Sequence, residues 1–159
     1  MGIAKAEYQS PIGILEVTGN EKEIESILFN EKEEIDFPVT DDTPHVIKDC
    51  IRQLDEYFRR ERVEFNIPYS VKGTDFQQSV WEALTSIPYG KTGTYKDIAV
   101  SIGNEKAVRA VGSANGKNKL TIVIPCHRII GTNGTLTGYA GGMERKEWLL
   151  AHEKQTLKD

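Results

Sequence analysis

The chain has 159 residues, of which 38% are hydrophobic and 28% charged, and its formal net charge at pH 7 is −4. These values are typical of an ordinary globular protein that forms one domain or two small ones. No apolar run approaches the roughly 20 residues that span a bilayer, and the start lacks the apolar core of a signal peptide, so we expect a cytoplasmic protein without membrane contacts.

The cysteines and histidines argue against the common metal sites. There are two cysteines and three histidines, and they form neither a Cys-x-x-Cys pair nor any other spacing typical of metal ligands. We therefore expect no metal and no cofactor. In the cytoplasm both thiols, Cys50 and Cys126, should stay reduced.

Charge is distributed unevenly along the chain. Residues 1–71 contain 8 Lys+Arg against 16 Asp+Glu, whereas residues 72–159 contain 12 against 8. Such a division favours an acidic half that keeps the protein in solution and a basic half that meets an anionic partner. Because the segment 68–73 has the composition of a linker, we expect two domains, 1–71 and 72–159.

The first half begins with three predicted strands, at 4–9, 13–18 and 24–29. The turn residues Ser10-Pro11 and Gly19-Asn20 separate them. Short strands joined by tight turns predict an antiparallel meander.

A helix is predicted next, with Thr43 as its N-cap and Pro44 at its first position. Its apolar residues have the three-and-four spacing of one buried stripe: Ile47, Cys50, Ile51, Leu54, Tyr57 and Phe58. Cys50 is therefore expected in the core. The alternating apolar residues of 63–67 predict one more strand, which Pro68 ends. This half is thus a small α/β domain.

The second half is predicted to be mainly helical. A capping box, Thr74 with Gln77, opens its first helix. Two further helices, 95–102 and 105–114, follow with only Gly103-Asn104 between them. Helix, short turn and helix is the outline of a helix-turn-helix motif, although two-helix corners of other kinds have the same pattern.

The second helix of this pair has features of a DNA-binding helix. Ala107, Ala110 and Gly112 are small and would allow close approach to a surface, while Arg109 projects a long cation. The alternative is a helix packed tightly against a neighbour, with Arg109 extending to solvent.

A candidate nucleophile lies near the end of a predicted buried strand. The β-branched run 121–124 predicts the strand, and Pro125 ends it. Cys126, His127 and Arg128 follow directly. A thiol, an imidazole and a fixed cation are thereby presented in a loop on a rigid scaffold. The alternative is a structural cysteine that behaves as a small buried hydrophobe.

The remaining residues predict a hairpin, a glycine-rich loop and a helix. Ile129-Ile130 continue as a strand, Asn133-Gly134 is a hairpin turn, and 135–139 return. The glycine-rich segment 138–142 suggests backbone lying close to a ligand or to another segment. The last helix is predicted at 144–154. Its packed residues should be Trp148, Leu149 and Ala151.

Four segments in the second half resemble the O6-alkylguanine-DNA alkyltransferases, also called methylated-DNA–protein-cysteine methyltransferases. They are Pro125-Cys-His-Arg128, Arg109-Ala-Val-Gly-Ser-Ala-Asn115, Tyr139-Ala-Gly-Gly142 and Glu147-Trp-Leu-Leu-Ala-His-Glu153, in the family's order and spacing. The first half is similar only in the order of its elements. The resemblance implies a ribonuclease-H-like α/β domain followed by a mainly α domain with a winged-helix-like helix-turn-helix.

The resemblance also implies a reaction. Cys126 would accept an alkyl group, His127 would take the thiol proton through a water, and Glu153 would orient His127. An unperturbed thiol has a pKa of about 8.5 and is mostly protonated at neutral pH, so a base is needed. The thioether product is stable. One turnover would therefore consume the protein.

The implied partner is duplex DNA that contains an alkylated guanine, approached from the minor groove by a monomer. Arg109 would fill the gap left by the flipped nucleotide, and Tyr95 would rotate the flanking phosphate and hydrogen-bond the base. Asn118 would tie the recognition helix to the active-site strand. The recognition helix would approach DNA through Ala107, Ala110 and Gly112. The pocket walls would be the backbone of Ile129 and the loop of Tyr139, Ala140 and Gly141.

Two residues depart from the family pattern. Lys119 stands where many relatives have proline, and Ala140 stands where some have a serine that can donate to the base oxygen. Whether O4-alkylthymine is also a substrate stays open. We expect Arg128 to tether its segment to backbone carbonyls.

Two other functions fit parts of the pattern. A lesion-binding protein without chemistry would bind alkylated DNA, although family members of that type replace the cysteine. A Cys-His hydrolase of acyl substrates would use the same dyad with repeated turnover, but it leaves the helix-turn-helix without a purpose.

Overall fold

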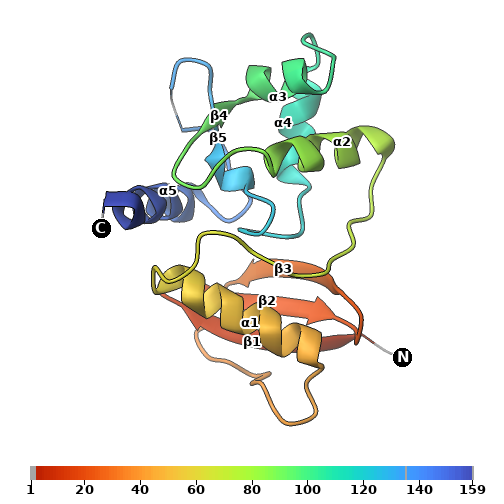
Figure 1. The fold of residues 1–159 in the computed structure, drawn as a ribbon, viewed down its shortest axis with the longest axis vertical. Helices are drawn as coiled ribbons and strands as arrows, with labels where there is room; N and C mark the ends of the chain where they lie inside the picture. Colours follow the sequence, from red (N-terminus) through yellow and green to blue (C-terminus); the bar gives the residue numbers. More distant parts are fainter. Residues whose placement is uncertain (1–2, 135, 159) are drawn as a thin grey trace. The chain divides into compact units, whose positions relative to one another are not determined.

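The computed structural model describes residues 3–134 and 136–158 (Figure 1). The chain forms two compact units. The first runs to Val71 and includes Lys119–Thr121, and the second contains Lys72–Asn118 and the chain from Ile122 onward. Within the described ranges, no helix has the length and apolar character required to cross a membrane.

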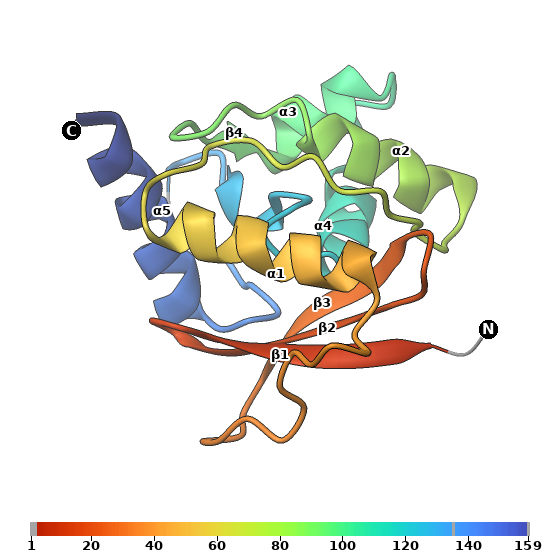
Figure 2. The same cartoon turned by 60° about the horizontal axis from the view of Figure 1, so that its bottom comes forward.

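The first unit is a three-stranded antiparallel sheet with one helix. The strands β1 (Ala4–Ser10), β2 (Gly13–Gly19) and β3 (Ile24–Asn30) pair in sequence order, which confirms the predicted meander. The helix α1 (His45–Phe58) lies across one face of this sheet (Figure 2). The core of the unit includes Ala6, Leu15, Val17, Ile27, Ile47, Cys50, Leu54 and Tyr57.

The start of α1 differs from the prediction. Its N-cap is Pro44, and no side chain caps the helix. The hydroxyl of Thr43, the predicted cap, instead accepts from the backbone N–H of Thr40 at 2.9 Å. Thr43 is therefore used in the preceding turn.

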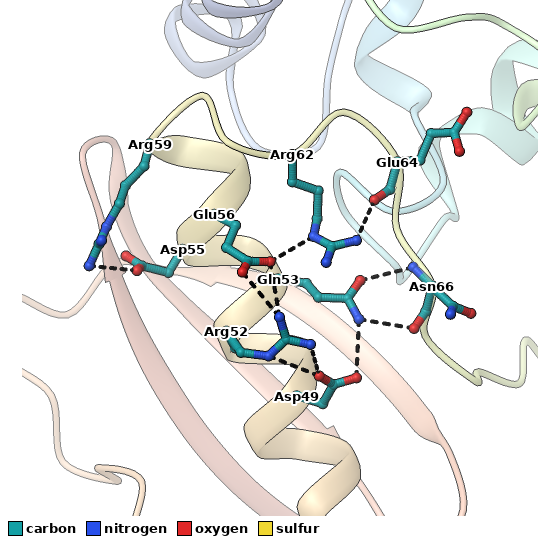
Figure 3. Close-up of polar contacts among 9 residues, drawn as sticks. All are labelled: Asp49, Arg52, Gln53, Asp55, Glu56, Arg59, Arg62, Glu64 and Asn66. Carbon is teal, nitrogen blue, oxygen red and sulfur yellow. Dashed lines mark hydrogen bonds and ion pairs between the residues drawn. The ribbon is translucent and has the colours of Figure 1, made fainter.

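The strand predicted at 63–67 is wrong. This segment has no regular structure. Just after it, Tyr69 forms an isolated bridge with Ile24. The physical reason is visible in Figure 3: the buried Gln53 side chain accepts from Asn66 N at 2.8 Å and donates to Asn66 O at 3.0 Å. Because a side-chain amide satisfies this backbone, no strand partner is required.

The second unit contains α2 (Asp75–Leu84), α3 (Tyr95–Ser101), α4 (Val108–Gly116) and α5 (Met143–Lys158). Capping boxes open α2 and α3, at Thr74 with Gln77 and at Thr94 with Asp97. The first of these boxes is the predicted one. The pair α3–α4 forms the expected helix-turn-helix, but α4 begins at Val108 and not at Glu105.

The chain before the candidate nucleophile is not a strand. Residues 121–124 form a buried turn, with Ile122 at a φ of +74°. Just before this turn, Ile27 N donates to Lys119 O and Thr121 N donates to Ile27 O, at 2.8 and 3.1 Å. A β-branched residue rarely adopts positive φ, so local pattern could not have predicted this turn.

The predicted hairpin is also not formed. Gly134 lies in a turn, with φ +84° and its N–H bonded to Gly131 O at 2.9 Å. Residues 136–139 have no regular structure, and Thr135 lies outside the described residues. The strand β5 (Ile129–Ile130) instead pairs in parallel with β4 (Gly93–Thr94).

Candidate active site

Cys126 begins a short 3-10 turn, Cys126–Arg128, with Pro125 as its N-cap. Its side chain is free of any disulfide and 5% exposed. The Asn118 side-chain amide donates to the Cys126 sulfur at 3.1 Å and to Ile124 O at 2.9 Å. Because the donor is an N–H group, this contact stabilises a thiolate more than a thiol.

His127 and Glu153 form a fully buried pair, with 2.7 Å between His127 Nε2 and Glu153 Oε2. A carboxylate only accepts, so Nε2 carries the proton and Nδ1 has a free lone pair. Among the described residues Nδ1 has no hydrogen-bond partner. The pair thus presents one unoccupied basic nitrogen.

Arg128 is part of the same cluster. Its Nε donates to Glu153 Oε1 at 2.8 Å and its Nη2 to Glu153 Oε2 at 3.1 Å. Its Nη1 donates to Ile87 O at 2.8 Å. The expected tether to a backbone carbonyl therefore exists, but two of these three hydrogen bonds go to a carboxylate. Arg128 thus binds both oxygens of the Glu153 carboxylate, a bidentate arrangement that fixes its orientation.

The protonation states follow from burial and from these contacts. Burial raises the pKa of the Cys126 thiol, against the opposing effect of the Asn118 amide. Burial also lowers the pKa of His127. For Glu153, burial alone would raise the pKa, but the bonds from His127 and Arg128 hold it well below its usual range. The resting site is thus a thiol, a neutral imidazole and a carboxylate.

Lys146 on α5 is a buried cation that sequence reasoning missed. Its side chain is fully buried, and Nζ donates to Thr137 O at 3.1 Å. Burial lowers its pKa. Its charge also opposes the rise in the pKa of Cys126. The signal was weak, because a lysine in a helix is usually a solvent-exposed residue.

A cavity of about 340 Å³ lies beside α4. It is lined by Tyr95, Gly112, Asn115, Gly116, Gly138, Tyr139 and Ala140. Tyr139 and Ala140 were expected in the pocket wall, whereas Ile129 and Gly141 do not line this cavity. Ile129 is fully buried in β5, and Gly141 O accepts from Arg145 at 3.0 Å.

Tyr95 and Asn115 join the expected pocket residues in that lining. The Tyr95 hydroxyl is 2.5 Å from the hydroxyl of Thr137. Asn115 was part of a recognised motif but had no assigned role. Asn115 lies three residues after Gly112, so the two share one face of the helix, and this spacing could have indicated that Asn115 faces the pocket.

The remaining residues of the predicted DNA surface lie on or next to α4. Arg109 and Ala110 are exposed, while Ala107 and Gly112 are half-buried. A Cβ at position 112 would lie 3.5 Å from the Tyr95 ring, an ordinary contact distance. In the part of the chain that the structure describes, no group of three His, Cys, Asp or Glu side chains could hold a metal ion.

Two family models match the chain. Residues 3–71 match the ribonuclease-like domain of 6-O-methylguanine DNA methyltransferase, and residues 75–155 match the DNA binding domain of the same family. Two similar sequences are named methylated-DNA–protein-cysteine methyltransferase. The one from Methanosarcina barkeri is 47% identical over 94% of this chain and 96% of its own length. The constitutive one from Bacillus subtilis is 44% identical over 95% of each chain.

Solved structures with the same fold come from Mycobacterium tuberculosis. Its O6-methylguanine methyltransferase is 40% identical, with a TM-score of 0.85 over 99% of this chain and 100% of that one. A structure of the Mycobacterium tuberculosis protein in complex with DNA is 42% identical, with a TM-score of 0.85 over 98% and 99% of the two chains.

Proposed function

Because this chain belongs to the 6-O-methylguanine DNA methyltransferase family, we propose that it repairs DNA by moving the alkyl group of O6-alkylguanine onto its own Cys126. The observation that carries the proposal is the cluster around that thiol. Asn118 donates to the sulfur, and the neighbouring His127 has one nitrogen bonded to Glu153 and the other without a partner among the described residues. This arrangement supports the roles of Cys126 as nucleophile, His127 as base and Glu153 as orienting carboxylate.

The proposed reaction is a single displacement at carbon. His127 Nδ1 takes the thiol proton through a water, and the thiolate attacks the alkyl carbon. The carbon–sulfur bond forms as the carbon–oxygen bond breaks, and the guanine leaves with the bonding electrons. It gains one proton, so the net change moves a proton from Cys126 to the base. The protein is consumed in one turnover.

Glu153 and Arg128 prepare the base for this step. The carboxylate accepts from His127 Nε2 and so fixes the tautomer in which Nδ1 is free. Arg128 holds both carboxylate oxygens. Because Glu153 stays ionised, it also stabilises the imidazolium that forms when His127 takes the proton.

The proposed partner is duplex DNA with the alkylated guanine flipped into the cavity beside α4. The reactive carbon is out of reach inside a base stack, so flipping is required. The exposed Arg109 would fill the gap, and Ala107, Ala110 and Gly112 would allow close approach in the minor groove. Tyr95 lines the cavity and would hydrogen-bond the base. Tyr139 and Ala140 would wall the pocket.

A monomer in the cytoplasm would suffice for this reaction. All the proposed residues belong to one unit of one chain, and a reducing compartment keeps the acceptor thiol free. Light scattering of the protein with and without duplex would test the monomer, because a dimer would double the mass of the free protein.

Transfer is tested by mass spectrometry after incubation with duplex that contains O6-methylguanine. Trypsin should release residues 120–128, which hold Cys126 but not Cys50. We expect this peptide to gain the mass of one methyl group, and the DNA to contain guanine in place of the lesion. Cys126→Ser should abolish the gain. The matched Cys50→Ser variant should retain it, because Cys50 is a core residue.

Other outcomes would support the alternatives. Tight binding with intact O6-methylguanine recovered afterwards would identify a lesion-binding protein. Repeated turnover of an activated ester, abolished by Cys126→Ser, would identify a hydrolase. Either result with an unmodified 120–128 peptide contradicts the proposal.

A further inference from the structure

Asn115 presents a buried oxygen that has no partner within the described part of the chain. The side chain is 5% exposed and lines the cavity beside α4, together with Tyr95 and Tyr139. Its Nδ2 faces Cys126 O at 3.5 Å. A carbonyl oxygen can only accept, so the nitrogen must be the atom on that side. Oδ1 is left without a hydrogen-bond partner.

A buried acceptor without a donor is unfavourable in a free protein, so such groups call for an explanation. Oδ1 belongs to a side chain in the cavity wall, and the cavity is large enough for a base. A ligand group that donates a hydrogen bond would satisfy it. A ligand that does so carries an N–H or O–H group on the edge that meets α4.

The chemistry of the proposed substrate offers one such group. Alkylation at O6 removes the proton from N1 of guanine, so N1, N3, N7 and O6 can only accept. The exocyclic 2-amino group is the only donor on the base. O4-alkylthymine has lost the N3 proton in the same way and has no donor on its base at all.

We propose that Asn115 Oδ1 accepts a hydrogen bond from the 2-amino group of the flipped O6-alkylguanine and makes the site select guanine over alkylated thymine. This inference rests on the proposed function. It assigns Asn115 a specificity-determining contact, separate from the chemistry at Cys126. A site built to pair with a donor rejects bases that lack it, because its own polar atom then stays unpaired.

Tyr139, which also lines the cavity, is suited to the rest of the base. The Tyr139 hydroxyl is buried and also lacks a partner in the described structure. A hydroxyl can donate to the ring acceptors that guanine presents. Asn115 also contacts the backbone of the nucleophile itself through Cys126 O. Recognition of the amino group would thus place the base relative to Cys126.

The test compares two lesions that differ only in the 2-amino group. Single-turnover transfer rates are measured on duplexes containing O6-methylguanine or O6-methylhypoxanthine. For the wild type we expect a preference for guanine of roughly 10-fold to 100-fold, the range for loss of one buried hydrogen bond. Asn115→Leu should slow transfer from guanine and leave the hypoxanthine rate nearly unchanged, so that the preference falls to about 1.

A matched control is Ser113→Ala, an exposed position on the same helix, which should keep the full preference. A purely structural role of Asn115 would slow both lesions equally and leave the preference intact, which would overturn the inference. Folding of Asn115→Leu is checked by circular dichroism. If that variant does not fold, the wild-type rates still decide.

The wild type alone gives two further results. Transfer from O4-methylthymine should be slower than from O6-methylguanine by at least 10-fold. Equal wild-type rates on guanine and hypoxanthine lesions would overturn the role of Asn115 and leave the proposed function intact. Failure to transfer from any lesion, with Cys126 unmodified, would overturn the proposed function and this inference with it.

Discussion

The helices α1 and α5 bury opposite kinds of side chain. In α1 the buried residues are mainly apolar, Ile47, Cys50, Leu54, Tyr57 and Phe58 among them, and the ion pairs lie on the outer face (Figure 3). Among the α5 side chains that the structure describes, the buried ones are Lys146, Leu149, His152 and Glu153. Charged side chains are almost never fully buried unless they are paired. The buried polar groups of α5 have such partners, because Glu153 binds His127 and Arg128 and Lys146 donates to Thr137 O.

The same contrast appears in two glutamates that both bind arginine. Glu56 on α1 pairs with Arg52 at 3.1 Å and with Arg62 at 2.8 Å on a partly exposed surface. Glu153 on α5 pairs with Arg128 at 2.8 Å and is fully buried. Water screens the first cluster and not the second. Replacing Glu153 should therefore lower the free energy of unfolding much more than replacing Glu56.

The largest effect is expected for Glu153→Gln. This change leaves the buried Arg128 without its carboxylate, and breaking a buried ion pair costs about 3–5 kcal/mol. The second unit should unfold at a correspondingly lower urea concentration. Both tryptophans of the chain, Trp81 and Trp148, lie in that unit, so tryptophan fluorescence reports its unfolding.

The control for this change is Glu147→Gln on the same helix. Glu147 is exposed, so its neutralisation should leave the urea midpoint almost unchanged. Equal stability of Glu153→Gln and Glu147→Gln would show that burial does not distinguish the two carboxylates. It would also contradict the conclusion that charged groups on α5 contribute more to stability than those on α1.

A medium effect is expected on lowering the pH. The pKa of His127 is lowered by burial in the folded state, so below a pH of about 6.5 the unfolded chain binds a proton that the folded chain does not. Stability therefore falls as the pH falls, by up to about 1.4 kcal/mol per pH unit for one group. The lowered pKa of Glu153 should add a second loss below a pH of about 4.5.

Urea unfolding followed by tryptophan fluorescence between pH 7.5 and 4 checks this dependence. His127→Gln should remove the first loss and keep the second. A midpoint that does not change between pH 7.5 and 5.5 would contradict a neutral, buried His127.

The smallest effect is expected for Glu56→Gln on α1. The ion pairs with Arg52 and Arg62 are partly exposed, and pairs of this kind contribute little to stability. The protection of the α1 backbone amides against hydrogen exchange, which reports the stability of the first unit, should hardly change. Any change should vanish in 1 M salt. A loss comparable to that of Glu153→Gln would show that the network in Figure 3 holds the unit together.

Local signals predicted the elements whose hydrogen bonds and packing are local. The three strands and the capping box of Thr74 with Gln77 are present as expected, because turns and caps depend on adjacent residues. The strand predicted at 121–124 failed, since apolar residues there are buried in a turn with Ile122 at positive φ. The sequence pattern therefore predicted the burial of this segment but not its backbone conformation.

The last helix shows why polar sites are harder to predict. Of the expected packed residues, Leu149 is buried, Trp148 is half-buried and Ala151 is exposed, while Lys146 is fully buried. The spacing of apolar residues cannot predict that a lysine is buried because its ammonium group donates to Thr137 O in a loop. Its burial is favourable only because the fold supplies that acceptor.

The sequence alone places Cys126, His127 and Arg128 side by side, because they are adjacent in the chain whatever fold surrounds them. It also determined the family through motifs held in order and spacing. The pairing of Glu153 with His127 was expected from the family resemblance, whereas the tertiary structure was needed to show that Arg128 binds the same carboxylate and that Asn115 Oδ1 has no partner among the described residues. Those pairings join residues far apart in sequence, and the free energy of a buried polar atom depends on which partner the fold brings within hydrogen-bonding distance.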